Sequence, residues 1–205
     1  MGIVFNCTME KPKLFIIAGC NGAGKTTASY TILPEILNCR EFVNADEIAK
    51  GLSPFQPEKV AIEAGRIMLR RIDDLLKEGI DFAFETTLAT RSYRNTILKA
   101  QAKGYSVTLL FFWLQNVELA KRRVEKRVSE GGHHIDKDVI ERRYDAGIKN
   151  LFEIYLSTAD TVLIYDNTSG NHTFVARKDL GSDIEIIDNQ IYNKILNAYE
   201  HTSKK

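Results

Sequence analysis

Short apolar runs alternate along this chain with longer segments in which apolar side chains recur every three or four positions. The short runs are typical of strands buried in a parallel sheet, and the longer segments have the period of amphipathic helices. This alternation predicts a doubly wound α/β fold, with helices on both faces of a mainly parallel, five-stranded sheet. The expected strands comprise residues 13–18, 41–44, 80–84, 105–114 and 161–165.

The segments between these runs predict the helices. One of them keeps helical spacing from Val60 to Leu76, and Gly79 follows as a typical helix end. After the last strand, residues 172–187 read as a C-terminal β-hairpin that precedes a final helix. The chain of 205 residues is long enough for one full hydrophobic core, so we predict a single domain over residues 1–205. The other expected helices comprise residues 26–33, 92–102, 117–128 and 136–156.

Residues 19–26 carry the clearest chemical signal, because they match the phosphate-binding pattern G-x-x-x-x-G-K-[ST]. Glycines let backbone N–H groups point at phosphate oxygens, Lys25 reaches the terminal phosphates of ATP, and Thr26 coordinates Mg²⁺. An ordinary glycine-rich turn is the alternative, and the apolar strand before the loop argues against it. The residues expected to bind the nucleotide here are Gly19, Asn21, Gly22, Ala23, Gly24, Lys25, Thr26 and Thr27.

Two acidic residues follow the next two strands of the predicted sheet. Ligands of open parallel sheets sit beyond the carboxyl ends of the strands, so Asp46 and Glu85 should share a cleft with the phosphate loop. Asp46 is the candidate general base for a substrate hydroxyl, although it or Asn44 could simply cap a helix. Glu85 stands where P-loop enzymes hold their metal, and it could instead bind a substrate hydroxyl with Thr86 or be a solvated strand end.

Basic helical segments flank the pair Gly131-Gly132, which resembles a hinge. We predict a lid over ATP, roughly residues 121–145, whose arginines stabilise charge on the transferred phosphoryl group. We assign Arg127 and Arg142 to catalysis, together with Lys25, and we assign Arg143 to binding of the acceptor. The roles of the adjacent residues Arg142 and Arg143 could be exchanged. The alternative is a solvated face with ion pairs within each helix.

Asn167 ends the last core strand together with Asp166, at a place where a loop could contact adenine. A turn supported by asparagine and Gly170 explains the same residues. His133 and His134 have no third ligand at metal-like spacing, so a plain loop is the better interpretation.

The composition excludes several broad classes. The chain is 27% charged and 44% hydrophobic with a net charge of +1, which argues against disorder, general nucleic-acid binding and membrane-surface binding. No apolar run reaches membrane-spanning length, and the N-terminus lacks a signal-peptide pattern. Cys7, Cys20 and Cys39 lack metal-like spacing and predict reduced thiols in a cytoplasmic protein. Within the phosphate loop, Cys20 reads as a small neutral filler.

The ordered set of motifs resembles the zeta toxin-like family of P-loop kinases, especially its compact bacterial members described as predicted ATPases. Toxin-type loops often carry proline where this chain has Asn21, and the segment 131–134 is a further departure. The matching segments are residues 19–26, 42–49, 84–88, 127–128, 131–133, 142–144 and 166–167, and they span residues 13–167.

The resemblance implies a kinase-like core in which ATP phosphorylates a hydroxyl of UDP-N-acetylglucosamine. It implies that Lys25 and Thr26 hold ATP and magnesium, that Asp46 is the catalytic base, and that Glu85 binds the sugar. One arginine from residues 123–127 and one of residues 142–143 would contact the phosphates. An antitoxin-like protein partner would fit such a family, although no segment of the chain indicates one.

We therefore expect an ATP-dependent small-molecule kinase whose acceptor is a nucleotide sugar, a nucleoside or another metabolite. The rival hypothesis is a nucleotide-dependent ATPase or switch that acts through a protein partner. Carboxylates at successive strand ends favour the kinase, because a switch has no need of a base for a substrate hydroxyl.

Overall fold

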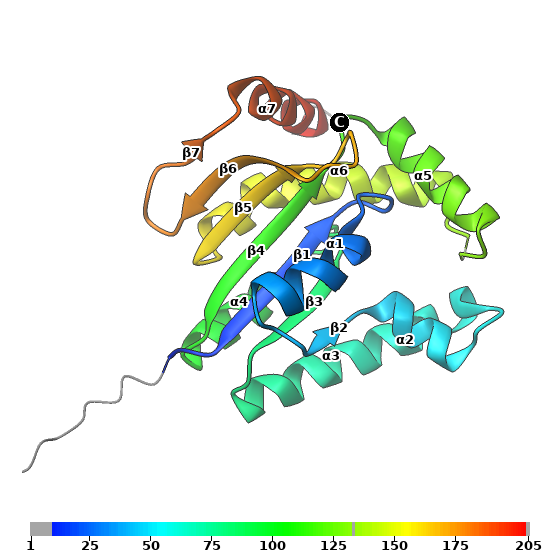
Figure 1. Cartoon of the computed structure of the whole chain (residues 1–205), viewed down its shortest axis with the longest axis horizontal. Coiled ribbons are helices and arrows are strands. Elements are labelled where there is room, and N and C mark those ends of the chain that lie inside the picture. The colour runs from blue at the N-terminus through cyan, green and yellow to red at the C-terminus, as the bar shows by residue number, and fades with distance from the viewer. Residues whose placement is uncertain (1–9, 133, 204–205) are drawn as a thin grey trace, which may run out of the picture.

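A computed structural model describes residues 10–132 and 134–203 of the chain. Its strands form one sheet in the order β2-β3-β1-β4-β5-β6-β7, in which the first five are parallel and the last two antiparallel (Figure 1). The strands are β1 Lys13–Gly19, β2 Phe42–Val43, β3 Phe82–Thr86, β4 Ser106–Trp113, β5 Thr161–Asp166, β6 Thr173–Asp179 and β7 Glu185–Ile186.

The predicted fold class is confirmed, but the predicted strand count of five is wrong. The five parallel strands are those expected from the apolar runs, and the C-terminal hairpin extends the same sheet to seven strands. Strand β6 pairs antiparallel with β5, for example through Leu163 and Arg177. A hairpin signal specifies only the pairing of its own two strands, so no local pattern indicated this edge contact.

The helices are close to those expected from the spacing of apolar residues. They are α1 Lys25–Thr31, α2 Ala45–Leu52, α3 Ala61–Glu78, α4 Tyr93–Ala102, α5 Val117–Ser129, α6 Lys137–Glu153 and α7 Asn189–Ser203. A π-helical turn, Ile32–Ile36, extends α1, and 3₁₀ turns at Pro57–Val60 and Tyr155–Ser157 precede α3 and follow α6. Gly79 ends α3 in the left-handed conformation, with φ 71°, as predicted.

The core lies between the sheet and its helices. Figure 1 shows α1 in front of the sheet and α4 and α6 behind it, so both faces are covered. Strand β4 is central and almost fully buried, which explains its nearly continuous apolar sequence. Helix α6 is fastened to the sheet by two buried hydrogen bonds, from Tyr144 Oη to the Leu114 carbonyl and from Asn150 Nδ2 to the Leu88 carbonyl.

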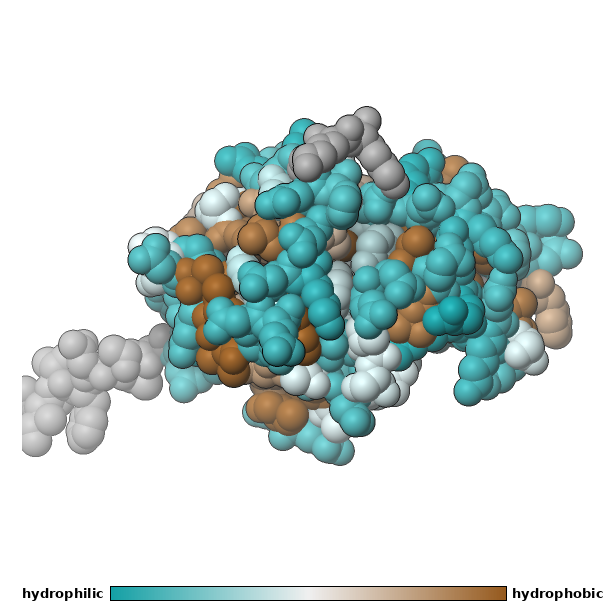
Figure 2. Space-filling model, turned by 90° about the horizontal axis from the view of Figure 1, so that it is seen from above, coloured by the Kyte–Doolittle hydropathy of each residue, from teal (hydrophilic) through white to brown (hydrophobic). Residues whose placement is uncertain are grey.

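The surface is mainly hydrophilic on the face shown in Figure 2, with hydrophobic side chains in separate patches. Several large apolar side chains are exposed, including Phe55 in the turn before α3 and Ile62 on α3. Within residues 10–132 and 134–203, no helix has both the length and the apolar character needed to cross a membrane.

Candidate functional site

The phosphate loop connects β1 to α1 and is curled as the motif requires. Gly22 and Gly24 have φ values of 79° and 80°, a region that side chains with a Cβ rarely adopt. Lys25 is buried, and its Nζ donates a hydrogen bond to the Cys20 carbonyl at 3.0 Å across the loop. The loop thus encloses Lys25, and its backbone N–H groups and the Lys25 ammonium can bind phosphate oxygens.

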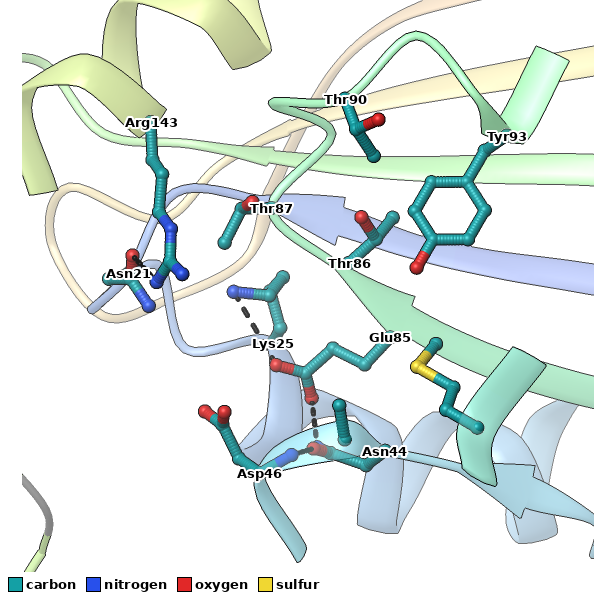
Figure 3. A pocket seen from close by; sticks show the side chains of 12 residues that line it. Asn21, Lys25, Asn44, Asp46, Glu85, Thr86, Thr87, Thr90, Tyr93 and Arg143 are labelled. Carbon is teal, nitrogen blue, oxygen red and sulfur yellow. Dashed lines mark hydrogen bonds and ion pairs between the residues drawn. The ribbon is translucent and has the colours of Figure 1, made fainter. Parts of the chain in front are cut away.

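Glu85 is the penultimate residue of the neighbouring strand β3, and its side chain points toward this loop (Figure 3). Its Oε2 accepts hydrogen bonds from Thr26 Oγ1 at 2.7 Å and from Asn44 Nδ2 at 2.9 Å. Its Oε1 lies 3.4 Å from Lys25 Nζ. The side chain is only 11% exposed, so the expected convergence of two strand ends on one cleft is present in the structure.

Asn44, and not Asp46, caps helix α2. The Asn44 Oδ1 accepts hydrogen bonds from the backbone N–H groups of Asp46 at 2.8 Å and Glu47 at 3.3 Å. This is the second of the two capping alternatives that the sequence left open. The Asp46 side chain is therefore not the cap, and it lies at the first turn of α2, facing the site.

Three adjacent cavities meet at Asp46. The first, of about 210 Å³, reaches Met68, Thr90 and Tyr93, and the Tyr93 ring lies 4.9 Å from that of Phe84. The second, of about 240 Å³, is the space over the phosphate loop, lined by Asn21, Gly22, Gly24, Lys25, Thr26, Thr27, Asp46, Glu85, Arg123 and Arg127. The third, of about 330 Å³, lies between α2 and the end of α5 and is lined by Thr26, Asp46, Glu47, Lys50, Arg127, Glu130, Gly131 and Gly132.

Of the two neighbouring arginines on α6, Arg143 reaches the site and Arg142 is exposed. Arg143 lines the first cavity, together with Thr86, and its Nη1 donates to Asn21 Oδ1 at 3.3 Å. Burial lowers the pKa of the Arg143 guanidinium, and the nearby Asp46 carboxylate partly offsets this. Arg142 lines none of the three cavities, so its assigned catalytic part stays a prediction.

Helix α5 supplies two more arginines. Arg123 donates to the carbonyls of Thr168 at 3.0 Å and Gly22 at 3.4 Å, so it ties the loop after β5 to the phosphate loop. Arg127 lines the second and third cavities. Its Nε and Nη2 are buried without a hydrogen-bond partner in the described part of the chain, so they are available to an anion in these cavities.

Asn167 lies behind the phosphate loop. The residue is buried, and its Nδ2 donates to the Ala23 carbonyl at 2.8 Å. It therefore supports the loop, and the predicted contact with the nucleotide base stays a prediction.

Among the described residues, the thiols and histidines form no metal-binding group. Burial raises the pKa of Cys20 to about 11, so this thiol is neutral, as expected of a filler. His133 and Cys7 lie outside the described residues, while His134 contacts Asp136 at 3.2 Å on the surface. Across the described ranges, no three His, Cys, Asp or Glu side chains are placed to hold a metal.

The sequence did not reveal that Asn44 both caps α2 and donates a hydrogen bond to Glu85. It also did not reveal that Arg123 joins the loop after β5 to the phosphate loop. It also missed Met68, Thr90 and Tyr93 in the wall of the first cavity. The Asn44 contact had a usable signal, an asparagine at a strand end two residues before the candidate base. The wall residues lie on α3 and around the start of α4, and no local pattern distinguishes them.

The family model of the zeta toxin matches residues 4–179 of the chain. An uncharacterised protein of Haemophilus influenzae is 30% identical over 132 residues, which cover 64% of this chain and 92% of that relative.

The fold is similar to that of two solved assemblies. A chain in the crystal structure of AvrRxo1-ORF1 and -ORF2 with ATP superposes with a TM-score of 0.72 at 18% identity, covering 90% of this chain. The present chain spans only 63% of the length of that AvrRxo1 chain. A chain of the PezAT chromosomal toxin–antitoxin system of Streptococcus pneumoniae gives a TM-score of 0.62 at 17% identity, covering 96% of this chain and 89% of that one.

Proposed function

The chain belongs to the zeta toxin family, and on this premise we propose that it is an ATP-dependent kinase that phosphorylates a hydroxyl of a small molecule. The observation that carries this proposal is the position of Asp46, which lines both the cavity over the phosphate loop and the first cavity beside it. A carboxylate at the junction of a donor space and an acceptor space is placed to act as a general base.

The reaction follows from this arrangement. Lys25 and Arg127 hold the phosphates of ATP, and Mg²⁺ bound with ATP neutralises their charge. The acceptor hydroxyl lies in the first cavity, where the Asp46 carboxylate takes its proton as the hydroxyl oxygen bonds to the γ-phosphorus. The bond from that phosphorus to the bridging oxygen breaks, and ADP leaves. Arg143 orients the acceptor at the edge of the first cavity.

The residues present fit magnesium and ATP. Thr26 and Glu85 place a hydroxyl and a carboxylate 2.7 Å apart beside the loop, and oxygen donors of this kind suit Mg²⁺. Magnesium is normally bound through one or two protein oxygens together with substrate phosphates and water, so a cluster of acidic side chains is not required.

The acceptor proposed from the family resemblance is UDP-N-acetylglucosamine. The first cavity supports a polyhydroxylated acceptor, since hydroxyl groups of Thr86, Thr87 and Thr90 line it. One chain of similar fold comes from a toxin–antitoxin system, and another comes from an assembly of AvrRxo1-ORF1 with -ORF2. On this basis we propose an antitoxin-like partner for this chain. We also propose that it works in the cytoplasm, in keeping with its buried, neutral Cys20 and Cys39.

A nucleotide-dependent ATPase or switch is the second candidate, because the phosphate loop alone is compatible with it. Incubation with γ-labelled ATP, Mg²⁺ and either UDP-N-acetylglucosamine or a metabolite extract separates the two, with Lys25→Ala as the control. A labelled metabolite that the control does not form supports the kinase. Release of inorganic phosphate without a labelled metabolite contradicts the kinase and supports the switch.

A further inference from the structure

The pair Gly131-Gly132, which resembles a hinge in the sequence, forms the C-terminal cap of helix α5 in the structure. Gly131 has a φ of 93°, and its N–H donates to the Val128 carbonyl at 3.0 Å. The N–H of Gly132 donates to the Arg127 carbonyl at 2.9 Å. These two bonds define a Schellman motif, in which the second residue after the cap bonds to the third-last residue of the helix. The cap of α5 therefore holds the backbone of Arg127, which lines the cavity over the phosphate loop.

The same motif ends helix α4, but there the large side chain lies on the other side of the contact. The Tyr105 N–H donates to the Ala100 carbonyl at 3.1 Å, and the Gly104 N–H donates to the Gln101 carbonyl at 2.9 Å. The second residue after this cap is thus a buried tyrosine, and the helix residue to which it bonds is an alanine. The motif itself therefore does not require a glycine at the position that Gly132 occupies in α5.

Gly132 is required because the side chain of Arg127 fills the adjoining space. A Cβ placed on Gly132 would lie 2.8 Å from Arg127 Cγ and 2.8 Å from the Arg127 carbonyl oxygen. Neither atom can move without a shift of the side-chain stem or of the last turn of α5. Gly132 does not have a left-handed φ, so this constraint comes from space alone. The stem of Arg127 thus packs on the bare backbone of Gly132, and this contact limits where the guanidinium can lie.

The position of this guanidinium matters because it has unused hydrogen-bond donors. Its Nε and Nη2 are buried without a partner among residues 10–132 and 134–203, and Arg127 lines two cavities that both reach Thr26. Given the proposed function, on which this inference rests and in which Arg127 holds the phosphates of ATP, we propose that Gly132 is the positioning residue of Arg127. The bare backbone of Gly132 keeps the guanidinium beside the phosphate loop before ATP binds, so less side-chain freedom is lost on binding.

The test is calorimetric titration of ATP into the wild type and Gly132→Ala, and it does not depend on phosphoryl transfer. We expect the ATP affinity of Gly132→Ala to fall roughly tenfold, because a hydrogen bond between charged groups is weakened or lost. The variant should also melt at a lower temperature, because the methyl group distorts the cap.

The matched control is Gly104→Ala, which strains the same motif at the end of α4. Gly104 has a φ of 87°, and a Cβ added there would meet no atom within 4 Å. This variant should also melt at a lower temperature but bind ATP like the wild type. A loss of ATP affinity as large as that of Gly132→Ala would overturn the proposal, because any weakened helix cap would then have the same effect.

The variant Arg127→Ala decides whether Gly132 acts through this arginine. Added to Arg127→Ala, Gly132→Ala should still lower the melting temperature, because the close approach to the carbonyl oxygen remains. It should cause no further loss of ATP affinity, because the group that it positions is gone. Equal losses of ATP affinity with and without Arg127 would overturn the proposal and make Gly132 a purely structural residue.

These measurements also separate the positioning role from the kinase function. If ATP affinity changes as expected but γ-labelled ATP never labels an acceptor, the kinase proposal fails and the positioning role of Gly132 stands. If Gly132→Ala binds ATP as tightly as the wild type while an acceptor is labelled, the positioning role fails and the kinase proposal stands.

Discussion

The backbone of Gly24 lies directly against the side-chain amide of Asn167. A Cβ placed on Gly24 would be 2.4 Å from Asn167 Nδ2, and that amide already donates to the Ala23 carbonyl at 2.8 Å. The last turn of the phosphate loop is thus packed between helix α1 and the residue that follows β5. The conformation of the loop depends on a residue 143 positions away in the sequence.

This contact predicts that Gly24→Ala abolishes ATP binding while the protein stays folded. The added methyl group must displace Asn167, and the loop then loses the shape that presents its N–H groups. Gly79→Ala is the matched control, because Gly79 also has a left-handed φ, of 71°, but a Cβ added there would meet no atom within 4 Å. Both variants should lose about 1 kcal/mol of unfolding free energy from backbone strain.

Titration of ATP and urea unfolding of the two variants check this prediction. Gly79→Ala should bind ATP like the wild type. If the two variants bound ATP equally well, the close contact between Gly24 and Asn167 would have no importance for nucleotide binding.

Arg143→Ala should weaken the reaction far more than Arg142→Ala. Arg143 lines the first cavity and contacts Asn21, whereas Arg142 is exposed. A hydrogen bond to a charged group is worth about 1.5–3 kcal/mol, so kcat/KM for the acceptor should fall about tenfold to hundredfold in Arg143→Ala. Steady-state kinetics of both variants with the identified acceptor provide the check, and a larger loss in Arg142→Ala would show that this face of α6 is misassigned.

Stability should fall as the pH rises from about 9 to 11, partly because of Cys20. Burial raises the pKa of this thiol to about 11, so the folded state keeps the proton in a range where the unfolded state has lost it. The unfolded state then binds fewer protons, and unfolding becomes easier by at most about 1.4 kcal/mol per pH unit for this thiol.

Urea unfolding of the wild type and Cys20→Ala at pH 8 and pH 10 isolates this contribution. Tyrosines and lysines titrate in both proteins, so the difference in slope reports the thiol. Cys20→Ala should lose less stability over this interval than the wild type does. Parallel curves would mean that Cys20 ionises as readily in the folded protein as in the unfolded chain.

The sequence was sufficient for the parts of the site that depend on local patterns. The phosphate loop follows from its glycine, lysine and threonine spacing, and the convergence of Asp46 and Glu85 follows from the order of apolar runs. The sequence also held an unused signal for which of Arg142 and Arg143 faces the first cavity. At helical spacing, Arg142 falls on the face opposite the apolar positions Ile140, Tyr144 and Ile148, whereas Arg143 borders that apolar face.

Other features depend on contacts between distant segments and had no local signal. The bridge from Asn44 to Glu85 requires β2 to pair with β3, and the contact of Asn167 with Ala23 requires the end of β5 to lie behind the phosphate loop. The edge pairing of the C-terminal hairpin with β5 is of the same kind. Composition and spacing describe each segment alone, whereas these contacts arise from the packing of the whole sheet.

The central claim is that Asp46 is the base that activates an acceptor hydroxyl beside bound ATP. The most direct measurement is transfer of label from γ-labelled ATP to the acceptor by the wild type and by Asp46→Asn, with ATP affinity measured on the same samples. General bases contribute about a hundredfold to ten-thousandfold to such reactions, so we predict a loss of this size with ATP affinity retained. Transfer by Asp46→Asn at the wild-type rate would contradict the account.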